Sequence, residues 1–231
     1  NKNMYYNTGR GTGFLGGMTP VIKNLVIINT LMLVITAFTG NFMYEKFSLF
    51  YFGSPLFKPY QLITHMFMHG GFIHLFFNMY SLIFFGVILE QVWGSKKFFL
   101  YYMITGLGAA FLHSLVLYFD ATSLLQAAEA GSIVAAEKYR ILISTPTVGA
   151  SGAIYGVLLA YGMLFPNNVL QLLFPPIALK AKWFVLIFGA IELFFGISNT
   201  GGNVAHFAHL GGMLFGYFLI LYWKKHNKMY F

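Results

Sequence analysis

The chain contains no cysteine, and only 9% of its 231 residues are charged. The first absence excludes disulfides, thiolate nucleophiles and cysteine metal sites. The second excludes an ordinary soluble domain, in which about 25% of residues carry a charge. Aspartate is almost missing as well, because Asp120 is its one occurrence. A Ser-His-Asp triad therefore has a single candidate for its third member, and that candidate falls in a predicted loop.

Apolar sequence takes the place of charge. Hydrophobic residues make up 58% of the chain, and the mean hydropathy is +0.70. With about 20 residues per membrane crossing, the length allows six spans and leaves no room for a separate soluble domain. We therefore predict an all-α membrane protein, a bundle of six transmembrane helices. The net charge of +8 does not indicate nucleic-acid binding, because the basic residues lie in short loops beside apolar segments.

The six predicted spans form one domain, residues 21–223. A flexible cytoplasmic tail precedes it at residues 1–20, and a basic cytoplasmic tail follows it at residues 224–231. The first tail is polar and glycine-rich, so it does not have the composition of a cleavable signal peptide. The spans are Val21–Phe38, His74–Val92, Phe98–Phe119, Val148–Leu164, Trp183–Ile197 and Val204–Trp223.

Two long connections interrupt the spans. Thr39–Gly71 is rich in aromatic residues and contains prolines, so we expect it to lie partly in the headgroup zone, where such rings are favoured. Asp120–Pro146 contains an alanine-rich stretch, Ser123–Tyr139, that predicts a short surface helix. Val169–Lys182 and Ser198–Asn203 are predicted to be shorter connections.

Basic residues predict the orientation of the chain. Six spans place both termini on one side, and that side carries ten lysines and arginines against four on the other. Cytoplasmic loops carry the excess of positive charge in membrane proteins. We therefore predict that both termini are cytoplasmic.

One serine, Ser151, lies among small residues at the start of the fourth span, in the stretch Thr147–Gly156. Gly149 and Gly152 flank it, and Tyr155 follows one helical turn later on the same face. Gly152 and Gly156 have the spacing that allows close helix approach in a membrane. Taken alone, this stretch is better explained by a packing seam than by a catalytic serine.

Polar residues in two other spans favour the catalytic interpretation. His74 and Asn78 begin the second span, and His209 lies near the start of the sixth. All these spans run inward from the outer side, so at 1.5 Å per residue the polar groups lie roughly 5–10 Å below that surface. Polar residues inside spans are costly and indicate function.

A serine hydroxyl and an imidazole at one depth are suited to acyl transfer, because histidine is the usual base for serine. Since Asp120 is expected in a loop, we predict a Ser151–His209 dyad, with Tyr155 positioning the imidazole by stacking. The Asn78 amide, the His74 imidazole and the Ser151 backbone N–H are candidate donors to the oxyanion. No cofactor is implied.

The remaining ionisable residues have simpler interpretations. His65 and His69 have zinc-like spacing but lack the glutamate of a metalloprotease motif, so no metal is expected. His206 shares a face with His209, and the glycines that follow His209 favour the latter as the base. We expect His113 to be packed or hydrogen-bonded and Glu90 to bind loop backbone or a lysine. Glu192 is expected to hold two spans together, with a polar pathway as the other interpretation.

The three motifs together resemble the rhomboid family of intramembrane serine proteases. That family pairs a Gly-x-Ser-Gly serine with an Ala-His-x-x-Gly histidine and a His-x4-His-x3-Asn pattern. Here these motifs are Gly149–Gly152, Ala208–Gly212 and His69–Asn78. The resemblance implies that Ser151 is the nucleophile, His209 the base, and His74 and Asn78 the oxyanion donors.

The resemblance also implies a setting. The basic six-span bacterial form fits best, which places the protein in a bacterial inner membrane with its site open to the outer side. The first connection resembles the family's membrane-embedded loop, although it lacks the Trp-Arg pair often found there. Span five and the Ser198–Asn203 loop resemble a gate and a cap.

The predicted function is endopeptidase cleavage of membrane proteins in or near their transmembrane segments. The alternative is a catalytically silent relative that binds transmembrane clients. A transporter is disfavoured, because the polar groups lie high in one leaflet and no internal repeat is visible. Partners are then substrates and lipid, and the oligomeric state is open.

Overall fold

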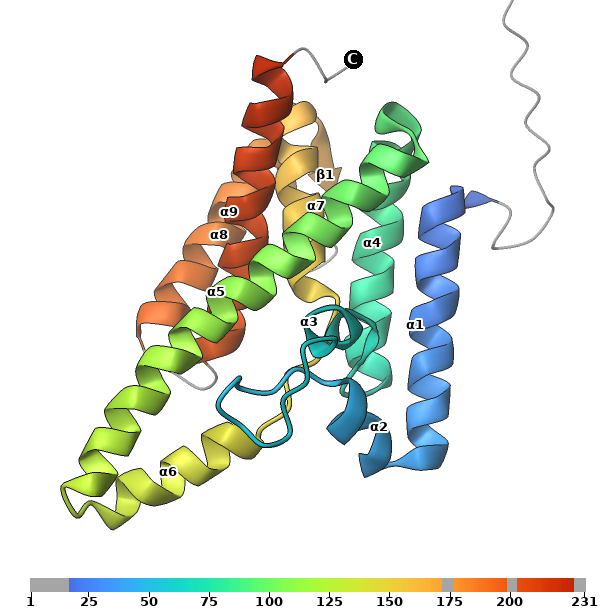
Figure 1. Ribbon diagram of the computed structural model, residues 1–231. Helices are drawn as coiled ribbons and strands as arrows, with labels where there is room; N and C mark the ends of the chain where they lie inside the picture. The colour runs from blue at the N-terminus through green and yellow to red at the C-terminus, as the bar shows by residue number, and fades with distance from the viewer. Residues whose placement is uncertain (1–16, 172–176, 199–202, 227–231) are drawn as a thin grey trace, which may run out of the picture.

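The computed structural model describes residues 17–171, 177–198 and 203–226 (Figure 1). Long helices that alternate in direction make up the bundle: α1 (Pro20–Thr39), α4 (Phe72–Trp93), α5 (Ser95–Glu129), α7 (Ser151–Leu164), α8 (Ala181–Ile197) and α9 (Asn203–Lys225). Four of these, α1, α4, α5 and α9, are long and apolar enough to cross a membrane. The helices α7 and α8 are shorter, with 14 and 17 residues. The predicted all-α membrane bundle is confirmed.

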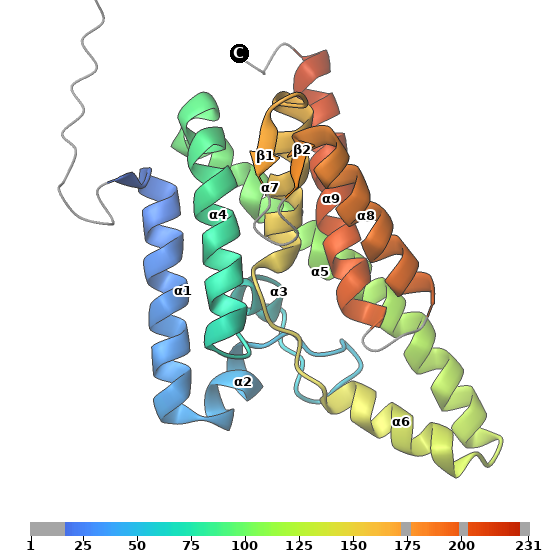
Figure 2. The ribbon, with the colours of Figure 1, turned by 180° about the vertical axis from the view of Figure 1, so that it is seen from behind.

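Short elements close the two ends of the bundle. The helices α2 (Asn41–Phe47), α3 (Gln61–Thr64), η2 (His65–Phe67) and α6 (Ile133–Ser144) lie at one end. A small antiparallel hairpin lies at the other, seen from behind in Figure 2, where β1 (Val169–Gln171) pairs with β2 (Ala178–Lys180). The start of α1 and the end of α9 are at the hairpin end.

The second long connection differs from its prediction. Asp120 lies in α5 rather than in a loop, because the helix continues to Glu129. The predicted surface helix Ser123–Tyr139 is split, since its first residues belong to α5 and the rest to α6. No glycine or proline interrupts the sequence between Phe119 and Gly131, so nothing ends α5 earlier. Gly131, with a φ of +96°, makes the turn.

The fourth span also begins later than predicted, at Ser151 rather than near Val148. Thr147 pairs with Leu49 in an isolated bridge, and the Gly149 N–H donates to the His65 carbonyl at 3.0 Å. These bonds hold the preceding segment extended, and Gly149 has a φ of +130°. The chain therefore enters α7 through a sharp bend directly before the serine.

The helix α1 is fastened to the bundle by Glu90 of α4. The Glu90 carboxylate accepts hydrogen bonds from the backbone N–H groups of Val21 and Ile22, at 2.9 and 3.0 Å, and from the side chains of Thr19 and Ser95. These are N–H groups that a helix start leaves without intrahelical partners. The prediction that Glu90 binds backbone is confirmed.

Candidate active site

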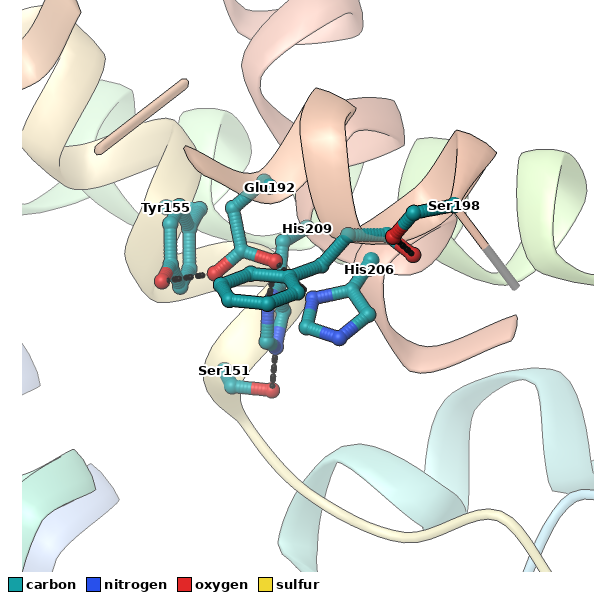
Figure 3. Close-up of polar contacts among 7 residues, drawn as sticks. Ser151, Tyr155, Glu192, Ser198, His206 and His209 are labelled. Atoms are coloured by element: carbon teal, nitrogen blue, oxygen red, sulfur yellow. Dashed lines mark hydrogen bonds and ion pairs between the residues drawn. The ribbon is translucent and has the colours of Figure 1, made fainter. Parts of the chain in front are cut away.

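Ser151 and His209 meet where α7 and α9 begin. The Nε2 atom of His209 lies 2.8 Å from the Ser151 Oγ atom (Figure 3). When the ring carries its proton on Nδ1, the serine hydroxyl donates this hydrogen bond. The structure thus brings together the predicted nucleophile and the predicted base, which are 58 residues apart in the sequence.

Glycines set this approach. A Cβ atom on Gly212 would collide with the backbone carbonyl of Gly152, so α7 and α9 touch through their backbones. Gly156 on α7 and Gly216 on α9, each one turn further along its helix, face α5 instead. A Cβ on Gly156 would lie 2.5 Å from Thr105, and one on Gly216 would collide with the Tyr101 hydroxyl. The two spans therefore meet at one glycine pair, and the second pair makes room for α5.

Gly149 brings a further predicted residue to the serine. A Cβ atom on Gly149 would lie 3.0 Å from the Cε1 and Nε2 atoms of His74 and 3.7 Å from the Ser151 Oγ atom. The His74 ring is thus beside the serine, and its Nδ1 atom accepts a hydrogen bond of 3.3 Å from the Gly70 N–H. This leaves His74 Nε2 facing the site.

Asn78 is placed differently from His74. Its side chain is buried, and its amide nitrogen donates to the His74 carbonyl at 3.0 Å, along its own helix. In this conformation one of the two amide N–H groups is engaged with backbone. A role for Asn78 with the oxyanion stays a prediction.

The Tyr155 ring lies flat against the His209 imidazole. The ring centroids are 4.2 Å apart and the planes differ by 7°. The Tyr155 hydroxyl donates to Oε1 of Glu192 on α8. The expected stacking is present, and the hydroxyl is anchored by a residue whose part in the site the sequence did not indicate.

Glu192 was expected to hold two spans together, and its buried carboxylate does join α8 to α7 and α9, but its place beside His209 was not predicted. Its Oε2 atom lies 3.0 Å from Nδ1 of His209 and 2.6 Å from Nδ1 of His206. The contact with His206 is a hydrogen bond. The contact with His209 has the distance of an ion pair without hydrogen-bond geometry. Glutamate inside an apolar span was the available signal, but its register relative to α9 could not be known.

The two histidines of the first connection, His65 and His69, are buried. His65 Nδ1 lies 2.9 Å from the Gln61 carbonyl, and burial lowers the pKa of His65 to about 4. Burial, with the nearby His74, also lowers the pKa of His69 to about 4. His65 begins the 3-10 helix η2 and Met68 after it is extended, so His65 and His69 do not share the face of one helix. The spacing that suggested a metal site is therefore not a helical one.

A small cavity of about 50 Å³ adjoins Ser151. Polar side chains from His65, His113 and Thr147 line it, and the Thr147 hydroxyl lies 2.8 Å from His113 Nε2. The expectation that His113 is hydrogen-bonded is confirmed. A water occupies about 30 Å³ in the liquid, so the cavity has room for water next to the serine.

Glu192, His206 and His209 each offer one possible metal-ligand atom. These three atoms lie within 4.8 Å of one another, which is a spacing compatible with a metal. Both Nδ1 atoms converge on one carboxylate oxygen at ion-pair distances. The Glu192 oxygen is therefore already engaged by a hydrogen bond with His206 and an ion-pair contact with His209. The absence of a metal requirement stays a prediction.

The domain match and the similar proteins all point to the same family. The Rhomboid domain model matches residues 56–226. RHOMBOID-like protein 2 of Arabidopsis thaliana is 28% identical over 95% of this chain, which spans 70% of that protein. RHOMBOID-like protein 6, mitochondrial, of the same plant is 31% identical over 70% of this chain and 43% of its own length. Rhomboid protein 1, mitochondrial, of Saccharomyces cerevisiae is 28% identical over 68% of this chain and 39% of its own length.

These relatives support an integral membrane protein. They are plant and yeast proteins, two of them named mitochondrial, and so do not fit the predicted bacterial inner membrane. The chain spans less than half of the two mitochondrial relatives. The domain match covers well over half of the present chain and includes all three motif regions. The chain therefore belongs to the rhomboid family.

Proposed function

We propose that this protein is an intramembrane serine endopeptidase in which Ser151 is the nucleophile and His209 the general base. The observation that carries the proposal is the 2.8 Å contact between His209 Nε2 and Ser151 Oγ inside a membrane bundle. A serine becomes a useful nucleophile when a base within hydrogen-bond reach takes its proton. Family membership supports the same reaction class.

The proposed reaction begins when Nε2 of His209 takes the Ser151 proton. The Oγ atom then bonds to the scissile carbonyl carbon, and the carbonyl oxygen becomes an oxyanion. Ser151 is the first residue of α7, so N–H groups without intrahelical partners lie next to that oxygen. The His74 ring beside Gly149 is the candidate side-chain donor. The imidazolium returns its proton to the leaving amine, and water then releases the acyl group by the reverse sequence.

The substrates we propose are membrane proteins cleaved in or near a transmembrane segment. In lipid, a helix satisfies its own carbonyls, so the substrate must unwind to present one to Ser151. Segments with small or helix-weakening residues meet that requirement best. The excess of basic residues on the side of both termini favours a site that opens to the opposite side, at the end where α2, α3 and α6 lie.

Cleavage of a transmembrane reporter in liposomes tests the proposal. We expect the parent to cleave, and Ser151→Ala and His209→Ala to be inactive while keeping the parent's thermal unfolding midpoint. Labelling of Ser151 by a serine-directed phosphonate gives a second readout that does not depend on the reporter. If the parent neither cleaves nor labels, the catalytically silent client-binding alternative replaces the proposal.

A further inference from the structure

We infer that Glu192 is a positioning residue for His209, which would make the site a Ser151–His209–Glu192 triad rather than a dyad. This inference rests on the proposed function, since it assigns a role to Glu192 in the same reaction. It goes beyond the interpretation that Glu192 holds spans together, which its bonds to α7 and α9 support.

Distances and burial carry the inference. Glu192 is 6% exposed, so its charge is poorly screened by water. Its Oε2 atom lies 3.0 Å from Nδ1 of His209, the nitrogen opposite the one that meets Ser151. In Figure 3 the His209 ring lies between the Glu192 carboxylate and the Ser151 hydroxyl. A carboxylate placed behind the base in this way favours the tautomer with its proton on Nδ1 and stabilises the imidazolium.

The proton balance involves only Ser151 and His209. Before attack, Nδ1 carries a proton and Nε2 is free to accept one. The Ser151 proton moves to Nε2 as the Oγ–carbon bond forms, and the resulting positive ring faces Glu192. Glu192 remains ionised throughout, and its contribution is the attraction between its carboxylate and the imidazolium. The proton then leaves Nε2 for the amine.

A second contact positions the same ring. Glu192 Oε1 accepts a hydrogen bond from the Tyr155 hydroxyl, and the Tyr155 ring stacks on His209. One carboxylate therefore restrains His209 through Nδ1 and, through Tyr155, against its flat face. A glutamate that only joined helices would not need both oxygens directed at the surroundings of one imidazole.

Glu90 shows what a purely structural glutamate looks like in this chain. It is 2% exposed, and its partners are backbone N–H groups and hydroxyls at the start of α1 and at Ser95. Neither Ser151 nor a histidine is among these partners. Glu90 is thus a matched control, a buried glutamate with a full set of hydrogen bonds away from the site.

His206 competes for the same oxygen. Its Nδ1 atom lies 2.6 Å from Glu192 Oε2, so the carboxylate is shared between two histidines. The titratable groups that face this pair are therefore Tyr155 from α7, His206 from α9 and, beyond Ser151, His74 from α4. In triads where the carboxylate serves one histidine, removal of its charge lowers kcat about 10⁴-fold. Because Glu192 is shared between two histidines, we expect a smaller loss of activity here.

The test compares Glu192→Gln with Glu90→Gln and the parent in liposomes across pH 5 to 9. Glu192→Gln has the same shape without the charge. We expect its kcat/KM to fall about 10- to 100-fold, with KM little changed. We also expect the acidic limb of its pH–rate profile to move down by about one pH unit, since an imidazolium without a carboxylate neighbour is less stable. Phosphonate labelling of Ser151 should slow in parallel. Glu90→Gln should lower thermal stability and leave the position of that limb unchanged.

The outcomes separate this inference from the proposed function. A parent that neither cleaves nor labels removes the proposed function itself. A parent that cleaves, with a folded Glu192→Gln variant that matches it in rate and in pH profile, overturns the positioning role of Glu192 alone. A lower rate with an unmoved acidic limb also overturns it, because that is the signature of a structural role.

If Glu192→Gln does not fold, Glu192→Asp tests the same inference. It keeps the charge and withdraws it from Nδ1 by one methylene. We expect a reduced kcat/KM with an acidic limb closer to that of the parent. A folded Glu192→Asp protein that cleaves as fast as the parent at every pH contradicts the inference.

Discussion

The imidazole of His209 stacks on the phenol of Tyr155 with centroids 4.2 Å apart and planes 7° from parallel. The two residues come from different helices, α9 and α7, and the contact leaves both ring nitrogens of His209 at its edges. One nitrogen meets Ser151 and the other faces Glu192. The stack thus fixes the ring plane without occupying either nitrogen.

Substitution of Tyr155 separates the stack from its hydroxyl. We expect Tyr155→Ala to lower kcat/KM by at least about 10-fold, because a free ring loses the orientation that the base requires. Tyr155→Phe keeps the ring and loses the bond to Glu192, so it should retain more activity than Tyr155→Ala. Reporter cleavage and phosphonate labelling of both variants measure the difference. Equal activity in the two variants would show that the ring face is irrelevant.

A methyl group on Gly212 should separate α7 from α9. Its Cβ would collide with the Gly152 carbonyl, which is backbone and cannot rotate away. Overpacking of this kind typically costs about 1–3 kcal/mol, and here it also moves His209 away from Ser151. We expect Gly212→Ala to be inactive and to unfold at a lower temperature.

Gly189→Ala is the matched control on α8. Its Cβ would lie 3.2 Å from the methyl end of Met213, a flexible side chain that can turn aside. We expect near-parental activity and stability from it. A Gly212→Ala protein as active as Gly189→Ala would contradict the close approach of the two helices.

His65 makes stability dependent on pH. Burial lowers its folded-state pKa to about 4, below the value of about 6.5 of an unfolded chain. The unfolded chain therefore takes up the proton first as the solution is acidified. The contribution is fully present above pH 6.5 and is lost as the pH falls toward 4. At pH 4.5 the loss amounts to about 2–3 kcal/mol.

Thermal unfolding in detergent between pH 7.5 and 4.5 measures this loss. We expect His65→Gln to be less stable than the parent at pH 7.5 but to show a weaker dependence on pH. His226→Gln provides the control, because His226 is exposed near the end of α9. Parallel curves for the parent and His65→Gln would assign the pH dependence to other groups.

Much of the architecture could be predicted because each helix that crosses a membrane appears in the sequence as a continuous apolar run. A span needs a long apolar run, and the punctuating residues at Gly94, Pro166 and Ser198 mark where such runs end. One departure, the longer α5, continued through a polar stretch because helix propensity, rather than hydrophobicity, decides where an exposed helix stops. Ser151, His209 and Tyr155 could be singled out because motifs and helical spacing can also be read from the order of residues.

The sequence by itself determined the membrane class, the helical bundle and the three motifs that mark a rhomboid protein. Only the tertiary structure decided which polar groups meet. Gly152 against Gly212 sets the separation of α7 and α9, and the rotation of α8 turns Glu192 toward Nδ1 of His209. Helical periodicity fixes which residues share a face of one helix. It cannot fix how a neighbouring helix is rotated about its axis, because that is set by packing along its whole length.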